Sequence, residues 1–215
     1  SSKLRAFIHL FDDEGSQDID LSASFHSKDF TVLDHLSWTR LKSQKLNSCH
    51  SGDVRCRQGA CAEYVDVSIQ QCLDAGVRYV TVNAYNYQGY AFDTINECVF
   101  GLMERQHPES NNTFLPKNIT NCVRLANKST SVVMCILDLV KREYIWADYE
   151  KDQIVIDHSD TKSDLVALLN VPKISVYDLL KLHVNARGTL SSTQKGADKV
   201  FKYDDFVTDY QKTAA

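Results

Sequence analysis

The chain has 215 residues and a formal net charge of −4, from 24 basic and 28 acidic side chains. Its length fits one large domain or one domain with a small appendage, and 43% hydrophobic residues suffice for a packed core. The charge excludes the strongly basic surface of general nucleic-acid or membrane-surface binders. No apolar run approaches the ~18–20 residues of a membrane span. We therefore expect a globular protein of the cytoplasm that binds neither nucleic acid nor membranes.

Two segments near the start, residues 4–11 and 18–25, alternate between apolar and polar side chains. A period of two residues is typical of a half-buried β-strand. Further strand candidates are residues 63–69, 77–85, 97–103, 119–125, 131–140 and 143–147. They recur with short connections, and between them residues 70–75 form at most one helical turn, closed by Gly76. The pattern predicts a mainly β protein with a β-sandwich over residues 1–155.

The pattern changes beyond residue 155. Residues 163–169 are helical in pattern, and a second helix begins after the capping residue Ser175 and ends before Gly188. Residues 151–215 carry nine basic and nine acidic side chains, so the whole net charge lies in the predicted sandwich. We expect residues 156–215 to form a small C-terminal α-helical appendage packed on the sandwich.

Two carboxylates stand in the second predicted strand. Asp18 and Asp20 alternate with the core residues Ile19 and Leu21, so both lie on the opposite face. Their backbones are ~6–7 Å apart, close enough for the side chains to share a hard cation. The same pattern also fits an ordinary polar face of an edge strand, and spacing does not decide between the two.

A glycine-containing loop offers further oxygen ligands. It begins with His50 and Ser51 and continues with Gly52, whose freedom at positive φ lets a loop curl around an ion, and Asp53. Glu63 and Asp66 follow in the next strand. Calcium takes 6–8 oxygens, so backbone carbonyls and water would have to complete a shell built from these side chains. The residue order is not that of an EF-hand.

Two arginines, Arg55 and Arg57, lie in the middle of this loop. Positive charge there opposes metal binding, and the guanidinium groups could instead pair with the carboxylates or hold a phosphate.

A second basic pair follows near the end of the last predicted helix. His183 and Arg187 are four residues apart and share a helical face, which fits either an anion grip or a C-terminal cap. Joined with His50, Asp53 and Arg55, they would give an enzyme or a nucleotide- or phosphate-binding protein its polar site.

The seven cysteines form no CxxC pair, and the chain has no Walker A, GxGxxG, GxSxG or HExxH motif. Several cysteines stand among apolar strand residues, where a reduced thiol behaves as a small hydrophobe. We expect them to be mostly reduced core residues, and we expect no enzyme, because no catalytic set is complete.

The order of motifs resembles the tellurium-resistance TerD family, in a divergent form. Residues 18–23 are similar to that family's DxDxSA-type strand, and residues 50–53, running into Glu63, are similar to its glycine- and acid-rich loop. Residues 131–140, followed by a segment containing Trp146, resemble its closing hairpin. The resemblance covers about residues 4–150.

The resemblance implies a bacterial, cytoplasmic β-sandwich protein associated with stress and tellurium resistance, which binds Ca²⁺ and acts as a non-enzymatic binding or scaffold module. It implies ligand roles for Asp18, Asp20, Asp53 and Glu63, and a protein partner in a stress or defence system. The chain departs from the family pattern at residues 55–58, where Arg55 and its neighbours replace acidic residues. A degenerate calcium site is therefore the expectation. The chain begins without a methionine, so a module of a larger protein is a third interpretation.

Overall fold

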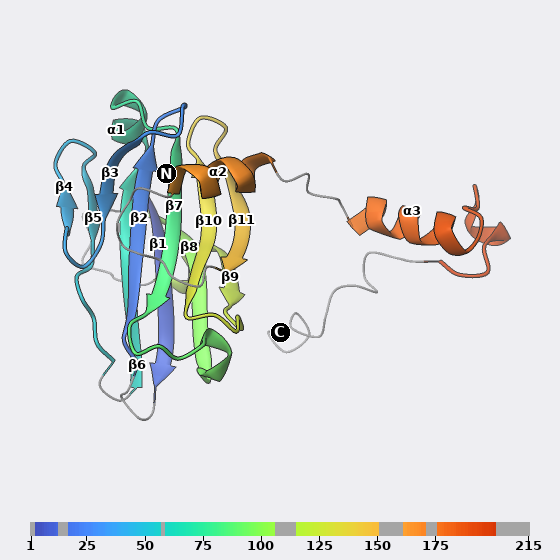
Figure 1. Cartoon of the computed structure of the whole chain (residues 1–215), viewed down its shortest axis with the longest axis horizontal. Helices are drawn as coiled ribbons and strands as arrows, with labels where there is room; N and C mark the ends of the chain where they lie inside the picture. Colours follow the sequence, from blue (N-terminus) through green and yellow to red (C-terminus); the bar gives the residue numbers. More distant parts are fainter. Residues whose placement is uncertain are drawn as a thin grey trace. The chain divides into compact units, whose positions relative to one another are not determined.

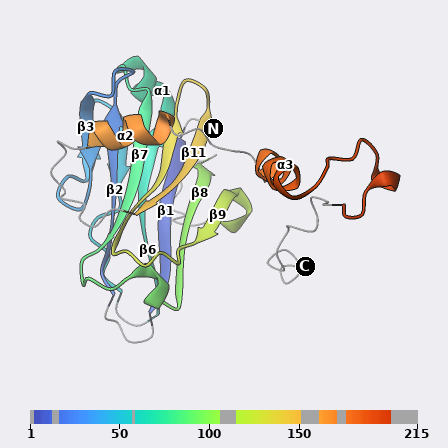
Figure 2. The same ribbon diagram turned by 45° about the vertical axis from the view of Figure 1, so that its right-hand side comes forward.

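The computed structural model describes residues 3–12, 17–56, 59–105, 115–150, 161–170 and 176–200. The chain divides into two compact units, Ser1–Asn170 and Val171–Ala215. Among the described residues, the first unit contains two antiparallel sheets, two α-helices and two 3₁₀ turns, and the second contains one α-helix and one 3₁₀ turn. Figures 1 and 2 show the two sheets of the first unit from two sides.

The six-stranded sheet has the order β4-β5-β6-β1-β8-β9. Its strands are β4 (Lys42–Ser43), β5 (Ser48–His50), β6 (Gly59–Ser68), β1 (Lys3–Asp12), β8 (Glu97–Arg105) and β9 (Ile119–Arg124). Within the sheet, Phe7 of β1 stands opposite Gly101 of β8. A Cβ at Gly101 would collide with the Phe7 ring, so the glycine makes room for the larger side chain.

The five-stranded sheet has the order β11-β10-β7-β2-β3. Its strands are β11 (Glu143–Glu150), β10 (Ser131–Asp138), β7 (Tyr79–Asn86), β2 (Ile19–His26) and β3 (Val32–Leu36). The main core lies between the two sheets, and β10 is buried along its whole length. In β2, Ile19, Leu21 and Ala23 are buried while Asp20 and Ser22 are partly exposed, as the alternation predicts.

The prediction of a mainly β sandwich is confirmed, and each predicted strand segment overlaps a strand of the structure. Helix α1 (Ile69–Asp74) matches the predicted helical turn, and Gly76 follows it with a φ of +83°. The pattern did not reveal β3, β4 and β5. The last two have two and three residues, too few to show a period, and β3 buries the polar Asp34, whose side chain binds Ser43 and Arg40.

Helix α2 (Thr161–Asn170) belongs to the unit of the sheets. Its Leu165 packs with Tyr79 and Ile136, which face away from the main core, so α2 lies on the outer face of the five-stranded sheet (Figure 1). The predicted boundary near residue 155 lies outside the described residues, and the two units divide after Asn170.

Helix α3 (Val176–Arg187) stands in the second unit, ends before Gly188 as predicted, and is followed by a 3₁₀ turn. Its expected cap, Ser175, lies outside the described residues. The 3₁₀ turns are η1 (Phe92–Thr94), η2 (Pro116–Asn118) and η3 (Gln194–Gly196). None of the helices in the described part of the chain combines the length and apolarity that a membrane crossing requires.

Candidate functional site

Three aspartates meet where β2 begins. Asp20 comes from β2, Asp18 directly precedes it, and Asp53 comes from the loop after β5. One carboxylate oxygen of each lies within 4.8 Å of the other two. Any two oxygens that bind one calcium ion are at most about 5.2 Å apart, so the spacing of the three carboxylates is compatible with a shared ion. The donor set is the hard, anionic one that calcium prefers, and it fits the ion.

Arg55 provides a positive charge at the same place. Its Nε lies 3.5 Å from Asp18 Oδ2, and its Nη2 lies 3.5 Å from Asp53 Oδ2. The side chain of Arg55 is 66% exposed, so both ion pairs are open to water and weak. Of the two alternatives left open for this arginine, the pairing with carboxylates is observed, and Arg57 lies outside the described residues.

Burial, and to a smaller extent the neighbouring charges, shift the pKa values of two of the aspartates. Burial raises the pKa of Asp20 to about 6, and the neighbouring charges of Asp18 and Asp53 add to this effect. Burial also raises the pKa of Asp18, against the influence of Arg55. The negative charge of the cluster is thus only partly compensated by the arginine, and a bound cation would complete the compensation.

Glu63 lies outside this group of three and has other partners. Its Oε1 accepts a hydrogen bond from the backbone N–H of Val54 at 2.8 Å, and its Oε2 accepts one from Leu21 at 2.9 Å. The side chain is buried, and this burial raises its pKa to about 8. Glu63 therefore ties the loop that carries Asp53 to strand β2. Asp66 lies apart from the cluster in a buried pair with Arg5, at 2.7 Å.

His50 is fully buried and uses both ring nitrogens. Its Nδ1 accepts a hydrogen bond from the backbone N–H of Gly52 at 3.0 Å. Its Nε2 therefore carries the proton, and this N–H donates a hydrogen bond to the carbonyl oxygen of Leu21 at 2.8 Å. Burial lowers the pKa of His50, which keeps the ring neutral. His50 thus shapes the loop with Gly52, whose φ is +103°.

The basic pair of the last helix lies in the second unit. Arg187 Nη1 is 3.0 Å from His183 Nδ1 on α3, and both side chains are exposed. The predicted sharing of one helical face is thus observed within α3.

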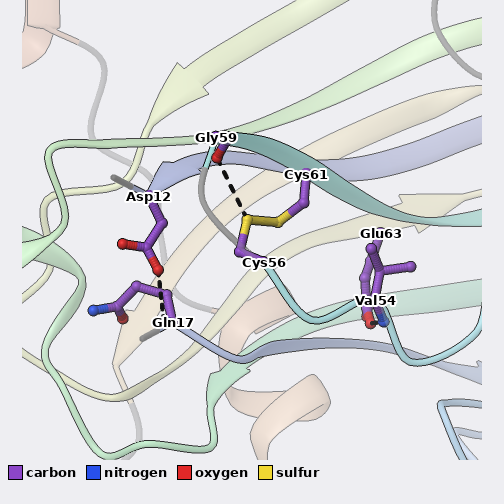
Figure 3. The surroundings of a disulfide bond; sticks show 7 residues. All are labelled: Asp12, Gln17, Val54, Cys56, Gly59, Cys61 and Glu63. Atoms are coloured by element: carbon purple, nitrogen blue, oxygen red, sulfur yellow. Dashed lines mark hydrogen bonds between the residues drawn. A yellow bond between two sulfur atoms is a disulfide. The ribbon is translucent and has the colours of Figure 1, made fainter. Parts of the chain in front are cut away.

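Cys56 and Cys61 form a disulfide, so the expectation of reduced cysteines is wrong for these two. The other five, Cys49, Cys72, Cys98, Cys122 and Cys135, are free thiols. The pairing links the loop after β5 to β6, with Gly59 between the two cysteines (Figure 3). Their spacing of five residues is not a recognised pairing motif, so the sequence offered no signal for this bond.

Comparisons with known proteins bear on the fold. No family model matches the chain, and no curated protein matches it by sequence. The crystal structure of a homologue of the telluride resistance protein TerD from Streptomyces coelicolor A3(2) is similar, with a TM-score of 0.56 and 13% identity. The match covers 73% of this chain and 94% of that one. A crystal structure of a protein of unknown function is also similar, with a TM-score of 0.52, 10% identity and coverage of 70% and 91%.

These matches agree with the antiparallel two-sheet topology of the first unit. The chain has a divergent TerD-like β-sandwich fold.

Proposed function

We propose that the chain is a non-enzymatic, TerD-like binding module that takes up Ca²⁺ at Asp18, Asp20 and Asp53. The observation that carries the proposal is the meeting of three carboxylate oxygens within 4.8 Å. The site is degenerate in the sense that Arg55 shares it, so the affinity is modest. Glu63 acts as a support that fixes the loop, because the backbone amides of Leu21 and Val54 bind its two oxygens.

The wider role proposed is that of a scaffold in a stress or tellurium-resistance system of the bacterial cytoplasm, working through a protein partner. It rests on the resemblance of the motifs and on the TerD-like fold. The alternative, an enzyme or phosphate-binding protein that uses His50 with Arg55 and the pair on α3, has less support. Both ring nitrogens of His50 have partners, Nδ1 in the loop and Nε2 at Leu21 of β2, which leaves no free nitrogen for acid–base work.

Calorimetry with CaCl₂ tests the calcium site. We expect the wild type to take up one ion per chain, with the heat lost in the double variant Asp18→Asn, Asp53→Asn, because two of the three anionic ligands become neutral. Asp29→Asn is the matched control, since Asp29 is an exposed aspartate outside the cluster. The proposal fails if neither the wild type nor an Arg55→Ala variant releases or absorbs heat at millimolar calcium.

A further inference from the structure

The disulfide joins the loop that carries Asp53 and Arg55 to strand β6, which carries the supporting residue Glu63. Cys56 is the residue after Arg55, and Cys61 lies on β6 two residues before Glu63. Cys56 is 3% exposed and belongs to the main core, while Cys61 is partly exposed and packs against that core. Figure 3 shows the bridge between Cys56 and Cys61, with Val54 and Glu63 further along the same two segments. The end of the loop is thereby fixed to the six-stranded sheet.

Hydrogen bonds hold the first part of the loop without help from the disulfide. The N–H of Ser51 donates to Tyr64 O at 2.9 Å, that of Gly52 to His50 Nδ1 at 3.0 Å, and that of Val54 to Glu63 Oε1 at 2.8 Å. Asp53 lies between two of these bonds, so its position does not depend on the sulfur bridge.

The position of Arg55, unlike that of Asp53, depends on the disulfide. It lies between the Val54 hydrogen bond and Cys56, so the disulfide holds the chain on its far side. Its own contacts to Asp18 and Asp53 are exposed ion pairs at 3.5 Å, which are too weak to hold a long side chain in place by themselves. Loss of the bridge would therefore loosen Arg55 more than Asp53.

We propose that the Cys56–Cys61 disulfide is a redox control of the cation site. In the oxidised protein the bridge keeps Arg55 over the carboxylates as an internal cation that competes with Ca²⁺. In the reduced protein Arg55 leaves, while Asp53 stays in place, and the site binds calcium more tightly. This inference rests on the proposed calcium function.

The chemistry requires a dithiol reductant. One of its thiolates attacks the sulfur of Cys61, the more exposed residue of the pair, the S–S bond breaks, and the mixed disulfide resolves as the reductant closes its own ring. Two electrons pass from the dithiol to the protein, and each cysteine sulfur takes up a proton. Buried thiols elsewhere are poor competitors in this exchange, since burial raises the pKa of Cys72 to about 11 and that of Cys98 to about 12.

Calorimetry with CaCl₂ on the oxidised and the dithiothreitol-reduced protein tests the inference. We expect reduction to lower the Kd roughly fivefold, the factor expected for the loss of two exposed ion pairs. The variant Cys56→Ser, Cys61→Ser should bind like the reduced protein with or without reductant. Cys122→Ser is the matched control, because Cys122 is an exposed free thiol, and it should keep the full redox response.

Arg55→Ala separates the mechanism from the calcium function. It should bind tightly in both redox states, so that the redox difference disappears. A redox difference that persists in Arg55→Ala, or equal affinities of the oxidised and reduced wild type, would overturn the inference and leave the calcium site intact. Absence of binding in every form would instead contradict the proposed function and the inference with it.

A calcium-free readout completes the test. Tryptic cleavage after Arg55, mapped by mass spectrometry, should become faster when the bridge is reduced, because the chain beyond Val54 is no longer fixed to β6. An unchanged cleavage rate would overturn the inference whatever the calcium result.

Discussion

Glu63 links two segments of the candidate site, because its carboxyl oxygens accept hydrogen bonds from the backbone amides of Leu21 and Val54. A buried carboxyl group that accepts two N–H bonds gains about 1–3 kcal/mol over one that leaves a donor unpaired. Glu63→Gln keeps one acceptor oxygen and places an NH₂ group against the other amide. We expect the free energy of unfolding of the variant, measured by urea denaturation at pH 5, to be about 1–3 kcal/mol lower than that of the wild type.

The same residue makes the loss depend on pH. Because burial raises the pKa of Glu63 from 4.5 to about 8, the folded state holds a proton that the unfolded state releases between these values. The stability that Glu63 contributes is therefore full below pH 4.5 and declines as the pH rises through about 8. The difference in free energy of unfolding between wild type and Glu63→Gln should therefore become smaller as the pH rises from 4.5 to about 8. The control Glu104→Gln changes an exposed carboxyl group, and a gap that stays constant would contradict the raised pKa.

The sequence predicted part of this arrangement. Strand alternation places Asp18 and Asp20 on one face, and the loop motif supplies Asp53, so the three carboxylates could be anticipated. The role of Glu63 could not, because its partners are backbone amides of Leu21 and Val54, which only the packing of β2 against β6 brings to it. A sequence names the side chains that can act as ligands, but it does not show which backbone N–H groups will face them.

At the scale of the secondary-structure elements, α2 packs on the outer face of the five-stranded sheet. Leu165 is 1% exposed and contacts Tyr79 and Ile136. Truncation of a buried leucine costs its transfer free energy and leaves a cavity, about 2–5 kcal/mol in total. We expect Leu165→Ala to lower the free energy of unfolding of the sandwich within this range, as measured by chemical denaturation.

A leucine of the other helix provides the matched control. Leu182 on α3 is 57% exposed, so Leu182→Ala should change the free energy of unfolding by less than about 0.5 kcal/mol. Equal effects of the two substitutions would contradict the packing of α2. Periodicity located both helices, but the packing of α2 on the sheet depends on contacts that a helical pattern alone does not specify.

On the scale of the whole molecule, the two units differ in how many of their described residues are buried. The first has a continuous core between its sheets, to which strands from both ends of the unit contribute. In the second, no residue of the described range 177–200 is buried. The strong alternation in residues 1–150 made the sandwich predictable, because a sheet with one buried face must show that period. The disulfide escaped prediction, since five residues of spacing say nothing about the turn that brings two sulfur atoms together.

This difference in burial predicts a difference in hydrogen exchange. Amides of β10 and β7, which lie side by side in the sheet and are buried, should open only with global unfolding and exchange slowest. Helix α3 has 12 residues, and isolated helices of that length are marginal in water. Its amides should therefore exchange many orders of magnitude faster than those of β10. Hydrogen exchange followed by mass spectrometry on the full chain measures both segments at once. Helix α2 is an internal reference: Leu165 anchors it to the sheet, so the protection of its amides should lie between that of α3 and that of β10. Protection of α3 equal to that of β10 would contradict the prediction and would mean that the apolar side chains of α3 are covered in solution.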